Sequence, residues 1–421
     1  MKLAVFVTEF PKTTETFILR DLMVFLEAGV DLRIYHLAPW RKDQILHGFA
    51  APLAGRARHL GLGSGAAVAG VLRHPLTAAW MAARILRHQG AEPVMAAKSL
   101  ALLPAALGIA EELREWGADH VHAEFAGHPA TAAWIVNAAI GVPYSVSCRA
   151  HDIFRSQRLL AQKFAAASAV RSVSEFTRVF LARKVAGVGE ADIDVIHSSV
   201  DVAAIPALPP APRNGTFRVL YVGALQQRKG VDVLLSALAG LDGDWRLDLA
   251  GDGPERARLE ALTRDLGLEA RVAFLGARPF EEISGLIEAA HVCVAPSVIG
   301  PKGRTEGIPN VMIEALAHQR PAISTRVSGI PELIRDGETG LMTEPGDIDA
   351  LRRALVEVRD DPDAAHALAV AGRAHVAAEF DLRRNAARQL EMFTRTGPLK
   401  AATAATPPAP LAPERIIPDA G

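Results

Sequence analysis

Residues 295–347, APSVIGPKGRTEGIPNVMIEALAHQRPAISTRVSGIPELIRDGETGLMTEPGD, contain the clearest strand–loop–helix signal in this 421-residue chain. The apolar run 292–295 predicts a buried strand that ends at Pro296 and Ser297. A Gly-rich loop follows, and Pro309 then suits the first turn of a helix, because its missing N–H would be unpaired there anyway. This arrangement places free backbone N–H groups at the carboxyl end of a strand, where α/β proteins bind phosphate.

Two carboxylates flank this predicted phosphate site. Glu306 lies in the loop before the helix, and Glu314 lies five residues beyond Pro309, roughly 7.5 Å along the axis at 1.5 Å per residue. One acid would therefore stand on each side of a bound diphosphate. The alternative is that Glu306 is a solvated loop charge and Glu314 a charge on a helix face, and the spacing alone leaves both interpretations open.

Composition limits the class of protein. The chain has 46 basic and 47 acidic residues, so it lacks the basic excess of a general nucleic-acid binder. Cys148 and Cys293 are its only cysteines; they lack metal-ligand spacing and fit a reducing cytoplasm. No run of about 18 uninterrupted apolar residues predicts a membrane span. We expect a cytoplasmic protein that is soluble or attached to a membrane surface.

Alternating strand and helix signals predict a parallel, doubly wound sheet in each half of the chain. The opening is a βαβ unit, in which Ile18, Leu22 and Phe25 share one face of the helix. Thr14 is a plausible cap for that helix. Strands are expected at residues 3–7, 32–37, 119–122, 143–147, 170–173, 193–196, 217–222, 245–250, 271–275 and 292–295, and late helices at 281–289, 348–358, 362–380 and 381–394.

Four prolines within residues 206–212 predict a stiff linker between two domains of about 200 residues each. The expected division is a first domain at 1–205, a linker at 206–215, a second domain at 216–380, a further helix at 381–397 and an Ala/Pro-rich, disordered tail at 398–421. Just after the first strand of the second domain, Arg228 and Lys229 precede a helix. Cations oppose the dipole at a helix N-terminus, so a bound anion would explain them better than solvent.

Residues 40–100 are rich in basic residues. Only Asp43 and Glu92 stand against Arg41, Lys42, Arg56, Arg58, Arg73, Arg84, Arg87 and Lys98. Segment 66–86 is helical in composition and mixes large apolar residues with arginines. That pattern is typical of an interfacial helix drawn to anionic lipid. It is equally typical of a packed helix pair with a basic solvent face, and the sequence leaves both open.

Three runs together resemble the carboxyl-terminal domain of family 4 glycosyltransferases, which are retaining enzymes of the GT-B fold that use nucleotide sugars. They are the Glu306–Glu314 pair with Gly307, SGIPEL at 328–333 and DGETGL at 336–341. The resemblance implies two Rossmann-like domains facing a cleft, with the acceptor on the first, the donor on the second, and a last helix crossing back to the first. It also implies that Glu306 contacts the donor sugar and Glu314 the ribose.

Further donor-binding residues follow from the same resemblance. Lys229 matches the family's lysine on the donor diphosphate, and Arg228 would supply the charge of an arginine that is replaced here by Ala224. The loop containing Arg278 resembles the one that holds the nucleotide base. The amides of the loop and helix start complete the predicted donor site, at Gly307, Ile308, Pro309 and Asn310.

The first domain supplies the other predicted site residues. The run YSVSCRAHDIF at 144–154 resembles the family segment whose histidine lies beside the donor sugar, which implies that role for His151, with Asp152 orienting it or capping a helix. Acceptor-side candidates are Thr14, Glu15, His122 and Glu124. The first loop, PKTTETFI at 11–18, lacks the family's usual Gly-Gly pair and resembles the exopolysaccharide and colanic-acid branch.

The sequence thus predicts a retaining transferase that moves a hexose from a UDP- or GDP-linked sugar to a saccharide acceptor, lipid-linked, in exopolysaccharide or cell-surface polysaccharide assembly at the cytoplasmic face of a membrane. Glu306 and His151 would stabilise and position the reacting groups. No cofactor is expected, because the nucleotide sugar is a substrate, and no Asp-x-Asp run predicts a metal site. The alternatives are a GT-B sugar-nucleotide epimerase and a non-catalytic partner protein that binds nucleotide sugars.

Overall fold

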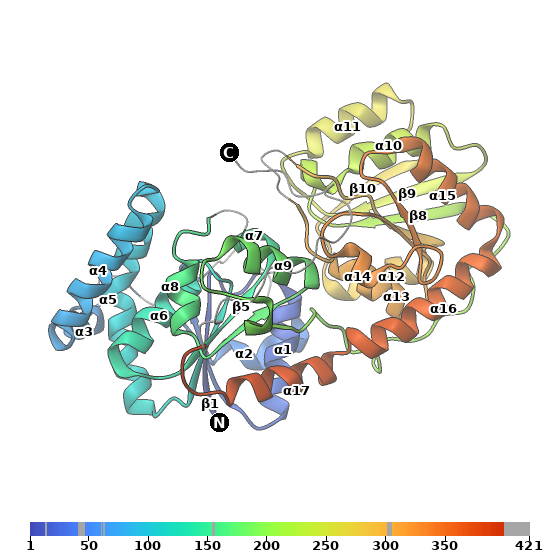
Figure 1. The fold of residues 1–421 in the computed structure, drawn as a ribbon. Helices are drawn as coiled ribbons and strands as arrows, with labels where there is room; N and C mark the ends of the chain where they lie inside the picture. Colours follow the sequence, from blue (N-terminus) through green and yellow to red (C-terminus); the bar gives the residue numbers. More distant parts are fainter. Residues whose placement is uncertain are drawn as a thin grey trace. The chain divides into compact units, whose positions relative to one another are not determined.

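The computed structural model describes residues 1–12, 15–40, 47–59, 61, 64–153, 156–300 and 305–399, without the side chains of residues 150 and 151. Thr14 and the tail at 400–421 lie outside the described residues. The chain divides into two compact units, each around its own parallel sheet (Figure 1). The first consists of Met1–His197 and the helix residues from Arg383, and the second of Ser198–Leu382.

The sheet of the first unit has the order β3-β2-β1-β4-β5-β6-β7 in the described part of the chain, and its strand pairs are parallel. Strand order therefore reverses between β1 and β4, as in a doubly wound fold. The strands are β1 (Lys2–Val7), β2 (Asp31–His36), β3 (Ala57–His59), β4 (His120–Glu124), β5 (Tyr144–Cys148), β6 (Ala169–Ser172) and β7 (Ile193–Val195).

The central strands β1, β4 and β5 are buried on both faces, as expected for a parallel sheet with helices on either side. β1 is accordingly an apolar run, whereas β4 and β5 also carry buried polar residues such as His122, Glu124 and Ser145. Leu3, Val5 and Phe6 are fully buried in β1. The covering helices are α1 (Thr16–Glu27), α2 (Ala51–Ala54), α3 (Gly65–Arg73), α4 (Pro75–Gln89), α5 (Pro93–Trp116), α6 (His128–Ile140), α7 (Ala150–Ile153), α8 (Leu160–Ala166) and α9 (Glu175–Lys184). In α1 the predicted face is the buried one, with Ile18, Leu22 and Phe25 inside.

Helices α3, α4 and α5 form a group at one end of the first unit (Figure 1). Two glycines allow α3 to approach α5 closely: a Cβ at Gly70 would lie 2.5 Å from the backbone N of Gly108, and a Cβ at Gly108 would lie 2.8 Å from the backbone of Ala66. Among the described residues, α5 is the one helix long and apolar enough to cross a membrane, but half of its apolar window is buried within the protein.

The second unit repeats the doubly wound order as β10-β9-β8-β11-β12-β13, again parallel in the described part. Its strands are β8 (Phe217–Val222), β9 (Trp245–Ala250), β10 (Val272–Gly276), β11 (Val292–Ala295), β12 (Ala322–Thr325) and β13 (Leu341–Thr343). Its helices are α10 (Val231–Ala239), α11 (Arg256–Asp265), α12 (Phe280–Ala289), α13 (Asn310–Ala317), α14 (Ile330–Leu333), α15 (Ile348–Asp360) and α16 (Pro362–Glu379).

The last helix, α17 (Leu382–Phe393), packs on the first unit, so the chain returns there as predicted. Its contact is partly polar and buried. Arg171 donates to Gln389 over 2.5 Å, and Gln389 donates to Asp21 over 3.0 Å. The ring of Phe393 lies 5.5 Å from that of Phe25 and 4.8 Å from that of His122, which completes the apolar part of the contact.

The glycine contact between α3 and α5 can be tested by substitution. Gly108→Ala is expected to lower the free energy of unfolding by about 1–3 kcal/mol, because the new methyl group would overpack against the backbone of α3. Gly285→Ala in α12 is the control, since nothing lies within 4 Å of its Cβ position and alanine favours a helix. Equal loss of stability in both variants by chemical denaturation would contradict the close approach of the helices.

Candidate active site

The loops that follow β8 and β11 meet at the carboxyl edge of the second sheet, because these strands are parallel neighbours. Lys229, at the end of the β8 loop, forms an ion pair through Nζ with Oε1 of Glu306 in the β11 loop. The Oγ of Ser297 donates a hydrogen bond to Oε2 of Glu306 over 2.6 Å. Thr325, which ends β12, donates in turn to the carbonyl oxygen of Ser297 over 2.6 Å. The carboxylate of Glu306 is therefore held from two sides.

Gly230 allows the two loops to approach. Its φ of +65° is a left-handed conformation, and a Cβ at this position would lie 1.9 Å from the carbonyl oxygen of Pro296. The carbonyl oxygen of Arg228 also accepts a hydrogen bond from the N–H of Val298 over 2.8 Å. The guanidinium of Arg228 contacts Oε1 of Gln226 within the same loop. The predicted cations thus lie beside the predicted acid.

Helix α13 begins directly after the Glu306 loop. Pro309 is the residue before the helix, with φ −66° and ψ 120°, and so precedes the first turn rather than forming it as predicted. Pro309 has no side-chain acceptor for this N-terminus, and its carbonyl oxygen accepts from the N–H of Met312 over 3.0 Å. The N–H groups of Asn310 and Val311 belong to the first turn, where a helix favours an anionic ligand. Gly307 and Ile308 form the loop just before it. Glu314, in the second turn, is 6% exposed.

Arg278 lies apart from this cluster in its contacts. It follows β10 and forms an ion pair with Glu282 on α12, with 3.1 Å between Nη1 and Oε2. Its side chain is more than one-third exposed. The structure therefore pairs Lys229, the neighbour of Arg228 in the β8 loop, with Glu306 in the loop that leads into α13. Arg278, by contrast, pairs with Glu282 of α12. Sequence reasoning missed Ser297 and Thr325, because hydroxyl residues at strand ends carry no distinctive local signal.

At the corresponding edge of the first sheet, Asp152 ties two loops together. Its carboxylate accepts from the N–H of Arg149 over 2.9 Å and also from the N–H of Ala126. Asp152 therefore joins the loop after β4 to the residue before α7; the two predicted roles, orienting His151 or capping the next helix, stay predictions. Burial raises the pKa of Asp152 to about 7, against the two backbone hydrogen bonds that lower it. The backbone of His151 lies in the same short helix, directly after β5; its side chain is not described.

Glu124 and His122 are buried at the end of β4. Arg149 donates to Oε2 of Glu124 through Nη2 over 3.2 Å, and Nε2 of His122 lies 3.5 Å from Oε1. Burial alone would raise the pKa of Glu124, but the facing Arg149 and His122 hold it well below its ordinary value of 4.5. The guanidinium of Arg149 also stacks over the ring of Phe17 at 4.0 Å. Arg149 is thus a central residue that the sequence did not single out.

Glu15 precedes α1 and forms an ion pair with Lys12 over 2.8 Å. Burial raises its pKa, opposed by the charges of Lys12 and Arg149. Glu15, Glu124 and Arg149 therefore influence one another electrostatically at the carboxyl edge of the first sheet. The described partners of Glu124 and His122 are protein groups, so any contact of these residues with an acceptor stays a prediction.

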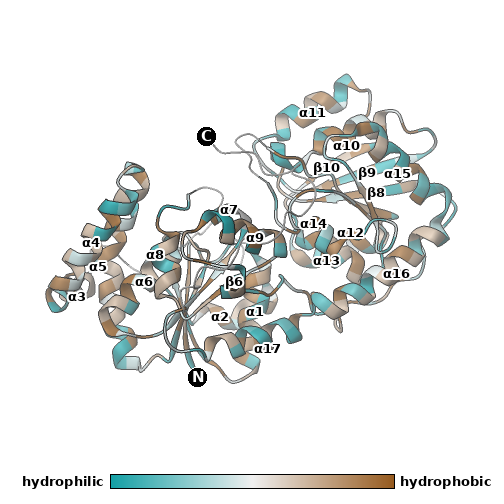
Figure 2. Cartoon of the chain, in the orientation of Figure 1, coloured by the Kyte–Doolittle hydropathy of each residue, from teal (hydrophilic) through white to brown (hydrophobic). Residues whose placement is uncertain are grey.

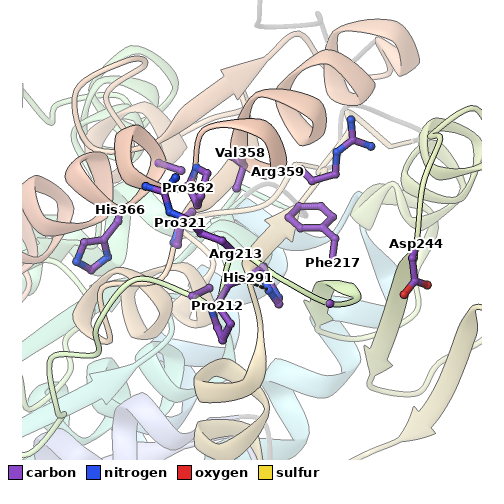
Figure 3. Close-up of a pocket in the computed structure, with 13 residues that line it drawn as sticks. Pro212, Arg213, Phe217, Asp244, His291, Pro321, Val358, Arg359, Pro362 and His366 are labelled. Atoms are coloured by element: carbon purple, nitrogen blue, oxygen red, sulfur yellow. Dashed lines mark hydrogen bonds between the residues drawn. The ribbon is translucent and has the colours of Figure 1, made fainter.

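Figure 3 shows a cavity of about 230 Å³ elsewhere in the second unit. It is lined by residues that include Phe217, His291, Pro321, Arg359 and His366. Phe217 begins β8, and His291 and Pro321 directly precede β11 and β12. The cavity therefore lies at the amino ends of the strands, away from Lys229 and Glu306, and does not belong to the candidate site.

Comparison with known proteins agrees with this geometry. Residues 216–361 match the family model described as glycosyl transferases group 1. The chain is 26% identical over 409 residues to the putative colanic acid biosynthesis glycosyltransferase WcaL of Salmonella typhimurium, covering 90% of this chain and 96% of that protein. It is 32% identical over 198 residues to glycogen synthase of Mycobacterium tuberculosis, a match that spans only 46% of each protein.

Among solved structures, HepE of Anabaena in complex with UDP superimposes with a TM-score of 0.72 at 19% identity, covering 93% of this chain and 99% of that one. Together with the two parallel sheets, these findings place the chain among the glycosyltransferases of the GT-B fold. Within that class its sequence resembles the family 4 enzymes in the runs around Glu306, and the similarity to the colanic-acid protein extends over most of its length.

The close approach at Gly230 yields a prediction for the second unit. In Gly230→Ala the methyl group would collide with the carbonyl oxygen of Pro296 and separate Lys229 from Glu306. Gly267→Ala has nearly the same φ, +68°, but nothing within 4 Å, so it should cost only the roughly 1–2 kcal/mol of the left-handed conformation. Denaturation curves should show a larger loss for Gly230→Ala, and equal losses would show that the loop contact contributes nothing.

The buried Glu124–Arg149 pair predicts a pH-dependent effect. Glu124→Gln leaves a buried guanidinium without its counter-charge and should lower the free energy of unfolding by about 3 kcal/mol at neutral pH. Because the folded-state pKa of Glu124 lies below 4.5, its stabilisation is present above that pH and is lost as the pH falls. The difference in free energy of unfolding between the variant and the wild type should therefore become smaller at acidic pH. Glu391→Gln at an exposed position of α17 is the control, and a stability difference independent of pH would refute the assignment.

Proposed function

We propose that the chain transfers a hexose, with retention of configuration, from a UDP- or GDP-linked sugar to a saccharide acceptor during polysaccharide assembly. The observation that carries the proposal is the Lys229–Glu306 ion pair. Glu306 lies in the loop before α13, and Ser297, which follows β11, donates a hydrogen bond to its carboxylate. The ion pair combines a cation for a phosphate with a fixed carboxylate for a sugar. The relative named for colanic acid biosynthesis supports the pathway class, and the UDP complex of HepE supports a uridine nucleotide.

The second unit would bind the donor. Lys229 and the N–H groups at the start of α13 would face the diphosphate, where the helix dipole adds positive potential. Glu314 on the same helix would accept hydrogen bonds from ribose hydroxyl groups. As Lys229 turns to the phosphate, Glu306 would lose its cation and become free to contact the sugar, while Ser297 continues to hold its other oxygen.

Bond cleavage leaves negative charge on the departing nucleoside diphosphate. Lys229, Arg228 and the α13 amides would stabilise that charge electrostatically, so the proposal requires no metal ion or cofactor. Glu306 and His151 would stabilise and position the sugar, with the leaving phosphate accepting the proton of the acceptor hydroxyl on the same face. A lipid-linked acceptor would place the reaction at the cytoplasmic face of a membrane.

Donor binding tests the proposal directly. One UDP- or GDP-sugar should raise the melting temperature of the wild-type chain and be hydrolysed slowly without acceptor, because a ligand of the folded state stabilises it by mass action. Lys229→Ala should lower the affinity for that donor about tenfold to a hundredfold, since a charged hydrogen bond contributes about 1.5–3 kcal/mol. Arg246→Ala, an exposed cation on β9, is the matched control.

The outcomes separate the candidate functions. Stabilisation without any donor hydrolysis or transfer would indicate a non-catalytic binding protein. Interconversion of the sugar on its nucleotide would indicate an epimerase. If no UDP- or GDP-sugar stabilises the chain, or if Lys229→Ala and Arg246→Ala bind donor equally, the assignment of the donor site is wrong.

A further inference from the structure

Helices α3 and α4 expose large apolar residues on their outer side. Of the eleven large hydrophobic residues exposed in the described part of the chain, five lie on these helices: Val68, Leu72, Leu76, Trp80 and Leu86. We call this set the α3–α4 outer face. Leu72 and Leu76 are 75% and 85% exposed, which is unusual for leucine in a protein of this size. Figure 2 shows hydrophobic residues along both helices.

The outer face is not the core-facing side of the helices. Met81 and Ile85 of α4 are fully buried in the core of the first unit, whereas Leu76 and Leu86 are 85% and 54% exposed. Trp80 lies between the two environments: it is 47% exposed, and its ring is 6.3 Å from that of Trp134 in α6. Leu76 and Leu86 are ten residues apart, which at 3.6 residues per turn places them within about 80° of each other around the helix. The expectation of a packed helix pair is therefore right for the inner side, but the solvent side is apolar as well as basic.

Within α3 and α4 themselves the charged side chains are all basic. Residues 65–89 contain Arg73, Arg84 and Arg87 and no Asp or Glu. Arg84 stacks on the ring of Trp80 at 4.7 Å, and Arg73 is paired with Glu111 on α5. Arg87 has no ion-pair partner among the described residues. The first turns of α5 also combine an exposed apolar residue, Val94, with an exposed basic residue, Lys98, four positions later.

We propose that the α3–α4 outer face docks the first unit onto an anionic lipid bilayer. Aliphatic side chains would enter the boundary between headgroups and acyl chains, Trp80 would lie at headgroup level, and Arg87 and Lys98 would contact lipid phosphates. A second copy of this chain fits less well. A twofold contact through this face would bring the arginines of both copies together without an acidic residue from 65–89 to balance them.

The surface would bring the enzyme to its acceptor if that acceptor is lipid-linked, but vesicle binding can be measured without any assumption about catalysis. The full chain should co-sediment with vesicles of phosphatidylcholine and phosphatidylglycerol, more weakly with phosphatidylcholine alone, and less as salt rises. The double variant Leu72→Gln/Leu76→Gln should bind at least about tenfold more weakly, because two exposed aliphatic side chains no longer enter the bilayer. Arg87→Glu should also weaken binding to the anionic vesicles.

Two matched controls lie on the second unit. Val370→Gln changes an exposed valine of α16, and Arg246→Glu reverses an exposed charge of β9; both should bind vesicles like the wild type. Donor-induced stabilisation should be unchanged in the double variant, so failure of donor binding and failure of membrane docking are distinguishable.

Absence of binding to anionic vesicles, or equal binding by the wild type and the double variant, would overturn the proposal. A concentration-dependent dimer that the double substitution abolishes, without vesicle binding, would also overturn it and assign the face to self-association.

Discussion

The ion pair between Lys229 and Glu306 is the contact on which the candidate site depends. Its partners are 77 residues apart and meet only because β8 and β11 are parallel neighbours whose loops leave at the same edge. Gly230 removes the steric barrier to that meeting, and Ser297 holds the carboxylate in place. The charges of Lys229 and Glu306 therefore lie together beside the N-terminus of α13. A diphosphate bound there would be stabilised both by the lysine cation and by the helix dipole.

The first unit uses the same design with deeper burial. Arg149, Glu124 and Asp152 connect the loops that follow β4 and β5. Removing either partner of the Arg149–Glu124 ion pair would destabilise the fold, because it would leave one buried charge without its counter-charge. The backbone of His151 lies in the short helix α7, which also contains Asp152. Rigid polar supports beneath surface loops are how α/β proteins combine a stable sheet with adjustable binding residues.

The three-helix group at the end of the first unit serves a different purpose from the sheet edge. Gly70 and Gly108 set α3 directly against α5, and this contact buries one side of the group while leaving aliphatic residues on the other. Donor chemistry on the second unit and lipid contact on the first would use separate surfaces of the chain. Such a separation would let the chain bind a lipid surface and a nucleotide sugar at the same time.

The sequence by itself determined three strands of the second sheet: 217–222, 245–250 and 292–295 were predicted with the bounds observed. Strand 292–295 is a continuous apolar run, and the other two combine several apolar residues with clear turn signals directly after them. The sequence also singled out Lys229 and Glu306 individually. The short strands β3, β12 and β13 were missed, because three or four residues rarely carry a decisive pattern, although the equally short β7 was predicted. Tertiary structure alone decided that Lys229 pairs with Glu306, that Arg149 supports Glu124, and which side of α4 faces outward. Each of these features depends on which distant segment of the chain packs against the residue, and a local sequence pattern does not determine that.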